Sequence, residues 1–329
     1  MLTKLTTAAV VTAALMASAT FANAEALRDK WCKDVKIRFF VGGAEGDAFG
    51  TIVYNGAKQA AADTGAQVDY VFSGWAVEKM VQQLREAVAA KPNGIAMMGH
   101  PGDDSIMPLA QQATKDGIKM MYQNVPVPKV VAAFGGGYVG AQQEAQGRAL
   151  GAEAAKLSGL KKGDTAIMIG PFDNQNRGAR ERGTVAALEE AGIKVVKINS
   201  DPNWGADPNQ AIPIVTAALV ANPTTKMVGY PGGQMLGNVP AFMKAAGKKP
   251  GDIFNFGFDT SPQIVEGFKA GWVQLTADQQ PFLQGYLPIL SLCQQVVYGL
   301  APLNADTGAG FVNPQNYQIV AKLATEALR

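Results

Sequence analysis

The chain has 329 residues, of which 47% are hydrophobic and 17% charged, and its formal net charge is +2. This composition is typical of a globular protein, and the length is enough for two domains with separate cores. Basic residues form no run longer than two, which argues against a nucleic-acid partner, because such proteins carry clustered positive charge.

The N-terminus, MLTKLTTAAVVTAALMASATFANA, is typical of a secretory signal peptide. Lys4 precedes a short apolar run, and the stretch ends in the small residues of Ala22-Asn23-Ala24. The apolar run is too short to span a bilayer comfortably, which argues against a membrane anchor. We therefore expect residues 1–24 to be a signal peptide and the mature chain, from about Glu25, to be exported from the cytoplasm.

Short apolar segments alternate with amphipathic segments along the mature chain. The apolar segments predict strands at residues 36–43, 68–74, 94–102, 119–126, 130–137, 165–172, 194–201, 226–233, 253–259 and 272–278. The amphipathic segments predict helices at residues 51–65, 77–90, 104–117, 141–159, 183–192, 209–220 and 291–300. Nearly continuous apolar strands that alternate with helices specify parallel sheets, and about ten strands are many for one open sheet. We therefore predict an α/β protein with two doubly wound, Rossmann-like domains.

The two cysteines, Cys32 and Cys293, lie near opposite ends of the mature chain. In an oxidising compartment they can form a disulfide, but only if the fold brings their Cα atoms within about 7 Å. His100 is the single histidine, and the cysteines are not clustered, so the sequence predicts no metal site.

Residues that follow the predicted strands are candidate ligand-binding residues, because open parallel sheets bind ligands beyond the carboxyl ends of their strands. Arg177, Arg180 and Arg182 lie at such a position, where a helix N-terminus also favours an anion. Trp75 and Trp204 follow other strands. Their rings either pack in the core or offer flat apolar faces that suit a sugar.

Two carboxylate-rich segments each have a structural and a functional interpretation. In GHPGDD, Asp103 and Asp104 cap the next helix, while His100 is a loop residue, a ligand hydrogen-bonder or the base of an exported enzyme. In GFDTSP, Asp259 caps a helix, or accepts hydrogen bonds from ligand hydroxyls and balances the charge of Arg180, or does both.

The stretch FGGGYVG contains G-x-G-x-x-G at Gly135, Gly137 and Gly140, which matches a dinucleotide-binding fingerprint. This match keeps an oxidoreductase among the alternatives. However, no acidic residue ends a second strand about 20 residues later. We interpret the stretch as a glycine-rich crossing between domains and expect no cofactor.

The order of motifs resembles the type I periplasmic sugar-binding proteins of ABC importers, with the ribose-binding proteins as the nearest group. A signal peptide is followed by GGAEGDAFG, ARERG, FGFDTSP and LTADQQ. The resemblance implies an N-terminal domain of residues 25–137 plus 280–311 and a C-terminal domain of residues 138–279 plus 312–329. A three-strand hinge would join these domains.

The resemblance also implies a function. A monomer would bind a small neutral sugar or sugar alcohol between the domains and deliver it to the membrane permease of an ABC importer. By the family pattern, Phe49 and Trp204 match stacking aromatics, and Gln279 matches a hinge amide. The implied ligand-binding residues are Phe49, Gln123, Asn124, Gln175, Arg177, Arg180, Trp204, Pro231, Asp259 and Gln279, with Trp75 and His100 as further candidates.

Three departures from the ribose-type pattern argue against ribose itself. Gln123 and Asn124 replace an Asp-Arg pair, residues 231–234 replace an Asn-Asp pair, and the loop before Arg180 is longer. The proline and the longer loop are similar to the autoinducer-2-binding branch, so a furanose-like signal is an alternative ligand and a signalling receptor an alternative role. An acidic sugar also fits if Arg177 reaches the cleft.

Overall fold

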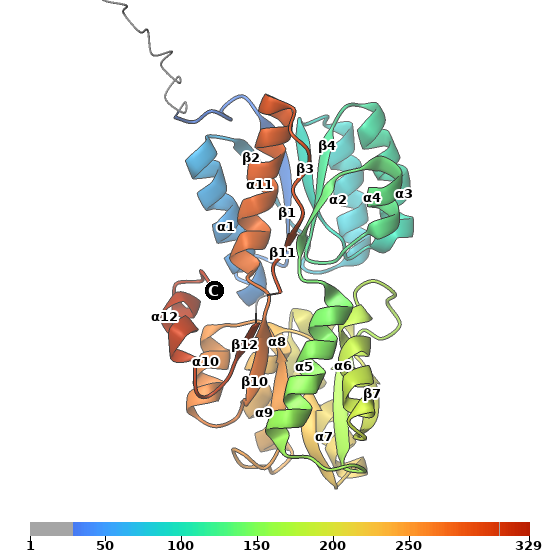
Figure 1. Cartoon of the computed structure of the whole chain (residues 1–329), viewed down its shortest axis with the longest axis vertical. Helices are drawn as coiled ribbons and strands as arrows, with labels where there is room; N and C mark the ends of the chain where they lie inside the picture. The colour runs from blue at the N-terminus through green and yellow to red at the C-terminus, as the bar shows by residue number, and fades with distance from the viewer. Residues whose placement is uncertain (1–28, 309) are drawn as a thin grey trace, which may run out of the picture.

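The structure is a computed structural model that describes residues 29–308 and 310–329, so the predicted signal peptide lies outside the described residues. Two α/β lobes lie end to end along the long axis of the molecule (Figure 1), and each is built on a six-stranded sheet. The prediction of two doubly wound, Rossmann-like domains is therefore confirmed. None of the helices in the described residues combines the length and apolarity that crossing a membrane requires.

The first sheet has the strand order β11-β5-β4-β3-β1-β2, and its paired strands are parallel. Its strands are β1 (Lys36–Gly42), β2 (Gln67–Phe72), β3 (Gly94–Met98), β4 (Lys119–Gln123), β5 (Gly137–Gly140) and β11 (Ala305–Asp306). Its helices are α1 (Ala48–Thr64), α2 (Val77–Ala89), α3 (Gly102–Lys115), α4 (Pro128–Phe134) and α11 (Pro281–Tyr298). α1 packs beside α11, whereas α2, α3 and α4 form a second row (Figure 1).

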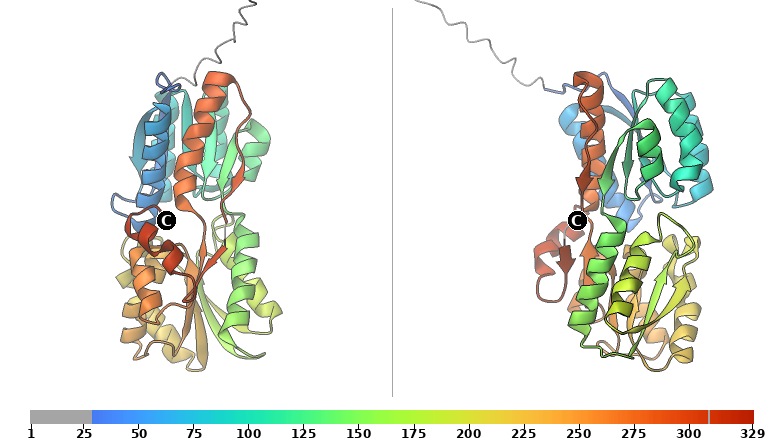
Figure 2. Two further views of the ribbon diagram at one scale, coloured as in Figure 1. Left: turned by 60° about the vertical axis from the view of Figure 1, so that its left-hand side comes forward. Right: turned by 45° about the vertical axis from the view of Figure 1, so that its right-hand side comes forward.

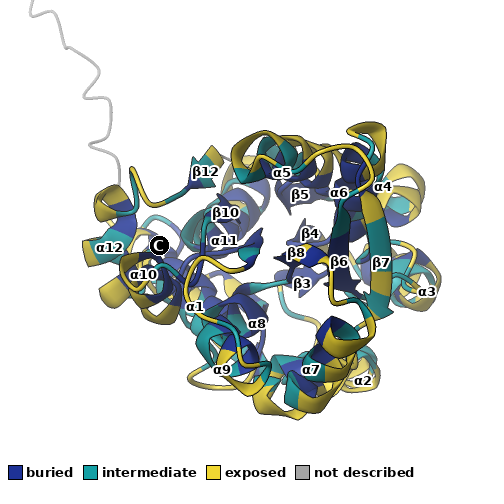
Figure 3. Ribbon diagram, turned by 90° about the horizontal axis from the view of Figure 1, so that it is seen from below, coloured by how far each residue is buried: buried dark blue, intermediate teal, exposed yellow. Residues whose placement is uncertain are grey.

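The second sheet has the strand order β12-β10-β9-β8-β6-β7, and only β12 runs antiparallel to its neighbour. Its strands are β6 (Thr165–Gly170), β7 (Lys194–Asn199), β8 (Thr225–Gly229), β9 (Phe254–Phe258), β10 (Leu275–Asp278) and β12 (Gly310–Val312). Its helices are α5 (Gln143–Ser158), α6 (Ala179–Glu190), α7 (Ile212–Ala221), α8 (Gly233–Gly237), α9 (Val239–Ala245), α10 (Pro262–Lys269) and α12 (Gln318–Thr325), with short 3-10 helices η1 (Pro202–Gly205) and η2 (Pro208–Ala211). Figure 3 shows mostly buried strands, apart from the edge strand β7, surrounded by helices whose outer faces are exposed.

The described chain passes between the two sheets after β5, after β10 and after β11. These passages bring the carboxyl ends of strands from both sheets to the same junction. Figure 2 shows the C-terminus and α12 beside this junction in both views. The domain limits expected from the sequence stay a prediction. Pairing of β5 with β4 extends the first sheet to Gly140.

One predicted strand is wrong: residues 130–137 do not form a strand, because α4 occupies Pro128–Phe134. Proline at the first helical position favours this start, since its missing N–H is not needed there. The Oδ1 atom of Asp103 accepts hydrogen bonds from the backbone N–H groups of Lys129 and Val130 at 2.8 and 3.0 Å. Asp103 therefore caps α4 and not α3, which was the sequence prediction.

The glycine-rich stretch at residues 134–140 leads directly to the first passage between the sheets but does not form it, because its last four residues form β5 between β4 and β11. A Cβ atom at Gly137 would collide with the carbonyl of Leu303, so this strand requires glycine to pack closely. The sequence predicted no element after residue 300. β11 and β12 are two and three residues long, which is too short for a periodic pattern.

A disulfide joins Cys32, just before β1, to Cys293 in α11, with the Cα atoms 5.7 Å apart. Both cysteines are fully buried in the core of the first domain. The bond spans a sequence separation of 261 residues. It therefore links the start of the first domain to α11, the helix with which the chain returns to this domain after β10.

We predict that the double substitution Cys32→Ala and Cys293→Ala lowers the free energy of unfolding of the first domain by about 2–5 kcal/mol, because the disulfide restricts the unfolded chain. Thermal unfolding followed by circular dichroism measures this. The wild-type protein in a reducing agent is the control and should melt near the variant. Equal melting temperatures for the variant and the oxidised wild type would contradict the prediction.

Candidate functional site

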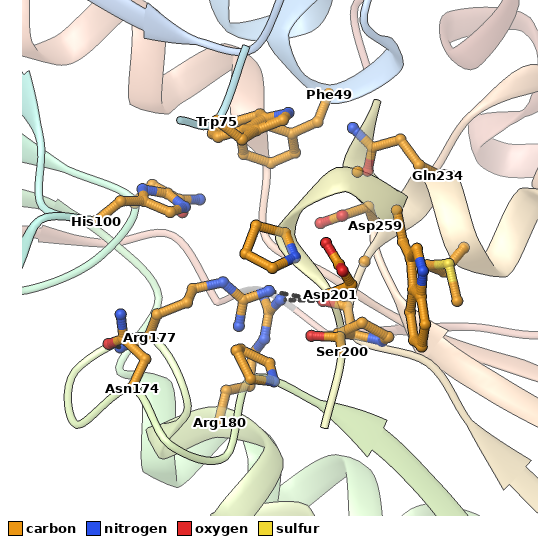
Figure 4. Close-up of a pocket in the computed structure, with 18 of the residues that line it drawn as sticks. Phe49, Trp75, His100, Asn174, Arg177, Arg180, Ser200, Asp201, Gln234 and Asp259 are labelled. Carbon is orange, nitrogen blue, oxygen red and sulfur yellow. Dashed lines mark hydrogen bonds between the residues drawn. The ribbon is translucent and has the colours of Figure 1, made fainter. Parts of the chain in front are cut away.

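A pocket with a volume of about 200 Å³ lies at the junction, where strand ends of both sheets meet (Figure 4). The first domain lines it with Phe49, Trp75, Val77, His100 and Asn124. The second domain lines it with Pro171, Asn174, Arg177, Arg180, Ser200, Asp201, Pro202, Trp204, Gly205, Pro231, Gly232, Gln234, Met235 and Asp259, and the passage after β10 adds Gln279.

Most residues predicted from the sequence come together in this pocket, namely Phe49, Trp75, His100, Asn124, Arg177, Arg180, Trp204, Pro231, Asp259 and Gln279. Gln123 and Gln175 do not line it. Gln123 is fully buried and donates from Nε2 to the carbonyl of Phe40 at 2.9 Å. Gln123 is the last residue of β4, and successive strand side chains point to opposite sides, so only Asn124 faces the junction. Gln175 is exposed, and its carbonyl accepts a hydrogen bond from Arg182.

Four polar residues of the pocket were not among the ligand-binding residues predicted from the sequence: Asn174, Ser200, Asp201 and Gln234. All four follow strands of the second sheet. The signal that identified the other residues, a position after a strand, was therefore present for these four as well. The Nε2 atom of Gln234 donates to Asp47, which lies in the first domain. This hydrogen bond joins the two domains directly.

Arg177 and Arg180 converge on one backbone carbonyl. Their Nη2 atoms donate to the oxygen of Pro231 at 2.9 and 2.6 Å, which Figure 4 shows as dashed lines. Arg177 also donates to both carboxylate oxygens of Glu181, at 2.8 and 3.0 Å. The guanidinium of Arg180 lies 3.8 Å from the centre of the Phe258 ring, in a favourable cation–π contact.

Glu181 is the carboxylate that balances these two arginines. Its side chain is fully buried, and its Oε1 atom lies 3.5 Å from the Nε atom of Arg180. Burial lowers the pKa of Arg180 to about 10, and the charge of Arg177 adds to this effect, whereas Glu181 and Asp259 oppose it. Arg180 is therefore charged at neutral pH. Protein carboxylates compensate this charge. The sequence predicted this role for Asp259 alone, whereas the structure adds Glu181.

Asp259 connects the ends of three neighbouring strands. It follows β9, and its carboxylate accepts hydrogen bonds from the backbone N–H of Gly233 at 2.8 Å and from Nε2 of Gln279 at 2.5 Å. Ser261, not Asp259, caps α10, because its hydroxyl accepts from the N–H of Ile264. The carboxylate is thereby held at the pocket and not at the helix.

Buried amides link the pocket to the passages between the sheets. The Nδ2 atom of Asn124 donates to Gln279 at 3.2 Å and to Gln284 at 3.0 Å. Gln284, in α11, donates in turn to the hydroxyl of Thr307, just after β11, at 3.0 Å. Asn124 has a φ of 65°, a strained conformation for a non-glycine residue. The amides hold this turn in place beside the pocket.

Aromatic rings line the pocket from both domains. Trp75 lies between Phe49 and His100, with ring centres 5.9 and 5.1 Å apart, and its Nε1 atom donates to Asp47 at 3.0 Å (Figure 4). Burial raises the pKa of Asp47, although its hydrogen bonds oppose this shift. Trp204 lines the pocket from the second domain and also packs in that domain's core, so the predicted core packing is confirmed and the contact with a sugar stays a prediction.

His100 is held in its neutral form. Burial lowers its pKa to about 3, and the positive charges of Arg177 and Arg180 add to the effect. The Nδ1 atom is buried and has no hydrogen-bond partner among the described residues. In the same residues, no group of three or more side chains has the composition to bind a metal ion.

The family model described as a periplasmic binding protein domain matches residues 38–299 of the chain. The chain belongs to this family. The match covers the β1 to α11 portion and hence both domains, and it agrees with the type I periplasmic sugar-binding family that the sequence motifs resemble. Its members are ligand-binding proteins, and their location is outside the cytoplasm.

Individual relatives agree with this assignment. The xylose/arabinose-binding protein of Sulfolobus acidocaldarius is 27% identical over 257 residues, which are 73% of this chain; the match spans 61% of that relative's length. A sugar-binding protein of an ABC transporter from Legionella pneumophila is 26% identical, with a TM-score of 0.70 over 86% of this chain and all (100%) of that one. A carbohydrate transporter from Acidothermus cellulolyticus, solved with myo-inositol, is 23% identical, with a TM-score of 0.75 over 90% of this chain and 99% of that one. The type I periplasmic binding protein fold is thus confirmed.

We predict that the imidazole of His100 does not titrate between pH 5 and 8. The unfolded side chain binds a proton near pH 6.5, whereas the folded one binds it near pH 3. His100 therefore makes stability fall as the pH decreases from about 6.5 toward 3, because only the unfolded state gains the proton. NMR measures this directly, since the chain has one histidine.

The protein unfolded in urea serves as the control for this titration, and its single imidazole should titrate near pH 6.5. A folded-state midpoint between pH 6 and 7 would show that His100 is solvated and would contradict the prediction.

Proposed function

We propose that this periplasmic binding protein binds a small neutral monosaccharide or sugar alcohol between its domains. The charge balance of the pocket is the observation that carries the proposal. Its lining cations, Arg177 and Arg180, already have protein carboxylates as partners in Glu181 and Asp259. Asp201 adds a further carboxylate to the lining. An anionic ligand would therefore bury its charge without a free cation, which is costly.

The shape and polarity of the pocket support the same ligand class. Aromatic rings from both domains can cover the apolar faces of a sugar ring, while amides, carboxylates and guanidinium groups can pair with its hydroxyls. A volume of about 200 Å³ suits one small molecule and not an oligosaccharide. We propose that the predicted residues that line the pocket bind the ligand, together with Asn174, Asp201 and Gln234.

The known ligands of relatives also support this proposal. A relative is a xylose/arabinose-binding protein, and solved structures of the same fold contain myo-inositol or D-arabinose. We therefore propose that this protein is a monomer in the periplasm that delivers its ligand to the permease of an ABC importer. A signal peptide at residues 1–24 would direct it there.

We infer that the protein catalyses no reaction on its ligand. The neutral imidazole of His100 has no hydrogen-bond partner at Nδ1 among the described residues. Figure 4 shows Ser200 on the other side of the pocket from His100, so these side chains do not form a nucleophile–base pair.

Titration calorimetry of the mature protein with matched pairs of ligands tests the proposed function. We expect at least one of D-arabinose, D-galactose and myo-inositol to bind. D-Galacturonate should bind at least about tenfold more weakly than D-galactose, because its carboxylate would be buried without a cation. Binding of only acidic sugars, nucleotides or amino acids would contradict the proposal.

We further predict that Arg180→Ala weakens sugar binding by about 2–4 kcal/mol, because it removes hydrogen-bond donors and the positive charge that lies beside the buried carboxylates. The matched control is Arg148→Ala, since Arg148 is an exposed arginine of α5 whose ion pairs are with Glu144 and Glu190 and not with the pocket. Calorimetry gives both dissociation constants, and circular dichroism checks folding. An unchanged constant for a folded Arg180→Ala protein would remove Arg180 from the ligand site.

A further inference from the structure

The loop between β6 and α6, residues 171–178, makes a polar contact between the domains that lies outside the pocket. Asn176, in this loop, is not one of the lining residues. Its Nδ2 atom donates to Oδ2 of Asp103 at 3.0 Å and to the carbonyl of Pro126 at 2.9 Å. Both acceptors belong to the first domain. Figure 1 shows this loop rising from the lower domain toward α3 and α4.

The acceptor of this contact is held in place by its own domain. The Asp103 side chain has only 6% of its surface exposed, and its Oδ1 atom accepts from the N-terminus of α4. The Oδ2 atom is left for Asn176, its one hydrogen-bond partner among the described residues.

The side chains of Gln234 and Asp47 form a second contact between the domains. A substitution there cannot test domain closure separately from ligand binding. Gln234 lines the pocket, so its substitution would change both. Figure 4 shows Gln234 on one side of the pocket and Asn174, from the 171–178 loop, on the other. Asn176, in contrast, is not a lining residue, so its substitution changes no side chain of the pocket.

We propose that Asn176 is a latch that holds the two domains closed and thereby sets how long a ligand stays bound. Its hydrogen bonds exist only while the domains are together, so they stabilise the closed state and not the open one. Asn176 is a positioning residue in this role, because it acts through the domain arrangement and not through the ligand. The kinetic test of this inference rests on the proposed function, because it needs a bound sugar. The test of the contact without sugar does not.

Stopped-flow kinetics with D-arabinose, D-galactose and myo-inositol give the first test. We expect Asn176→Ala to raise the dissociation rate of every sugar that binds by about tenfold, which corresponds to the loss of a hydrogen bond to a charged group. Association rates and the rank order of the sugars should stay the same. The matched control is Gln175→Ala, the exposed neighbouring residue, which should leave all rates unchanged. Unchanged dissociation rates, a new rank order or an equal effect of the control would overturn the proposal.

A reciprocal exchange tests the contact itself. Asn176→Asp places two carboxylates together and should raise the dissociation rate more than Asn176→Ala does. Adding Asp103→Asn restores one donor and one acceptor in reversed order, and Oδ1 of residue 103 can still cap α4. Slow dissociation should then return in part, because the hydrogen bond to the carbonyl of Pro126 stays lost. If the effects of Asn176→Asp and Asp103→Asn on the dissociation rate simply add in the double variant, the latch is overturned, because a general structural role of the two residues predicts no rescue.

Disulfide trapping gives a test that needs no sugar. In the ligand-free protein, Asn176→Cys combined with Asp103→Cys should form a disulfide under oxidising conditions, because even transient closure brings these side chains together. The matched control, Gln175→Cys combined with Asp103→Cys, should form it far more slowly. If no sugar binds the wild type, the proposed function fails while trapping still decides the contact. No trapping of the first pair, or equal trapping of both pairs, would overturn the latch.

Discussion

The buried carboxylate of Glu181 is the constraint on which the pocket depends. Two guanidinium groups can lie beside each other in a buried site only if their charge is compensated, because unpaired buried charges are costly. Glu181 holds Arg177 through two hydrogen bonds and lies beside Arg180, and both arginines then donate to the carbonyl of Pro231. This arrangement joins α6, the loop before it and the residues after β8 into one rigid wall. The wall supplies hydrogen-bond donors without requiring a negative ligand.

The rest of the site depends on how the two domains are connected. Buried amides of Asn124, Gln279 and Gln284 lie where the chain passes between the sheets, and they reach the pocket through Asp259. Asn176 and Gln234 make contacts between the domains away from these passages. The pocket is thus enclosed by polar contacts at the passages and at its sides. Ligand residence should depend on all of them, although only some touch the ligand.

Much of the site could be predicted because it follows from strand ends. Parallel sheets place the residues after their strands at one edge, and Arg180, Trp204 and Asp259 reached the pocket for this reason. Gln123 did not, because the last residue of β4 points away from the junction. The strand predicted at residues 130–137 failed because Asp103, from another element, caps a helix there. Glu181 was missed because a glutamate in a helix carries no local sign that it will be buried.

The sequence by itself determined most of the strands and helices, the two-domain α/β class and the chemical character of the strand ends, because apolar periodicity and residue type are local properties. Only the tertiary structure decided which distant residues meet. It placed Cys32 against Cys293, brought Arg177 and Arg180 to the carbonyl of Pro231, and brought Asn176 to Asp103. These contacts depend on the order of strands in two sheets and on three passages between them. Such long-range geometry is set by the packing of whole elements, which no short stretch of sequence records.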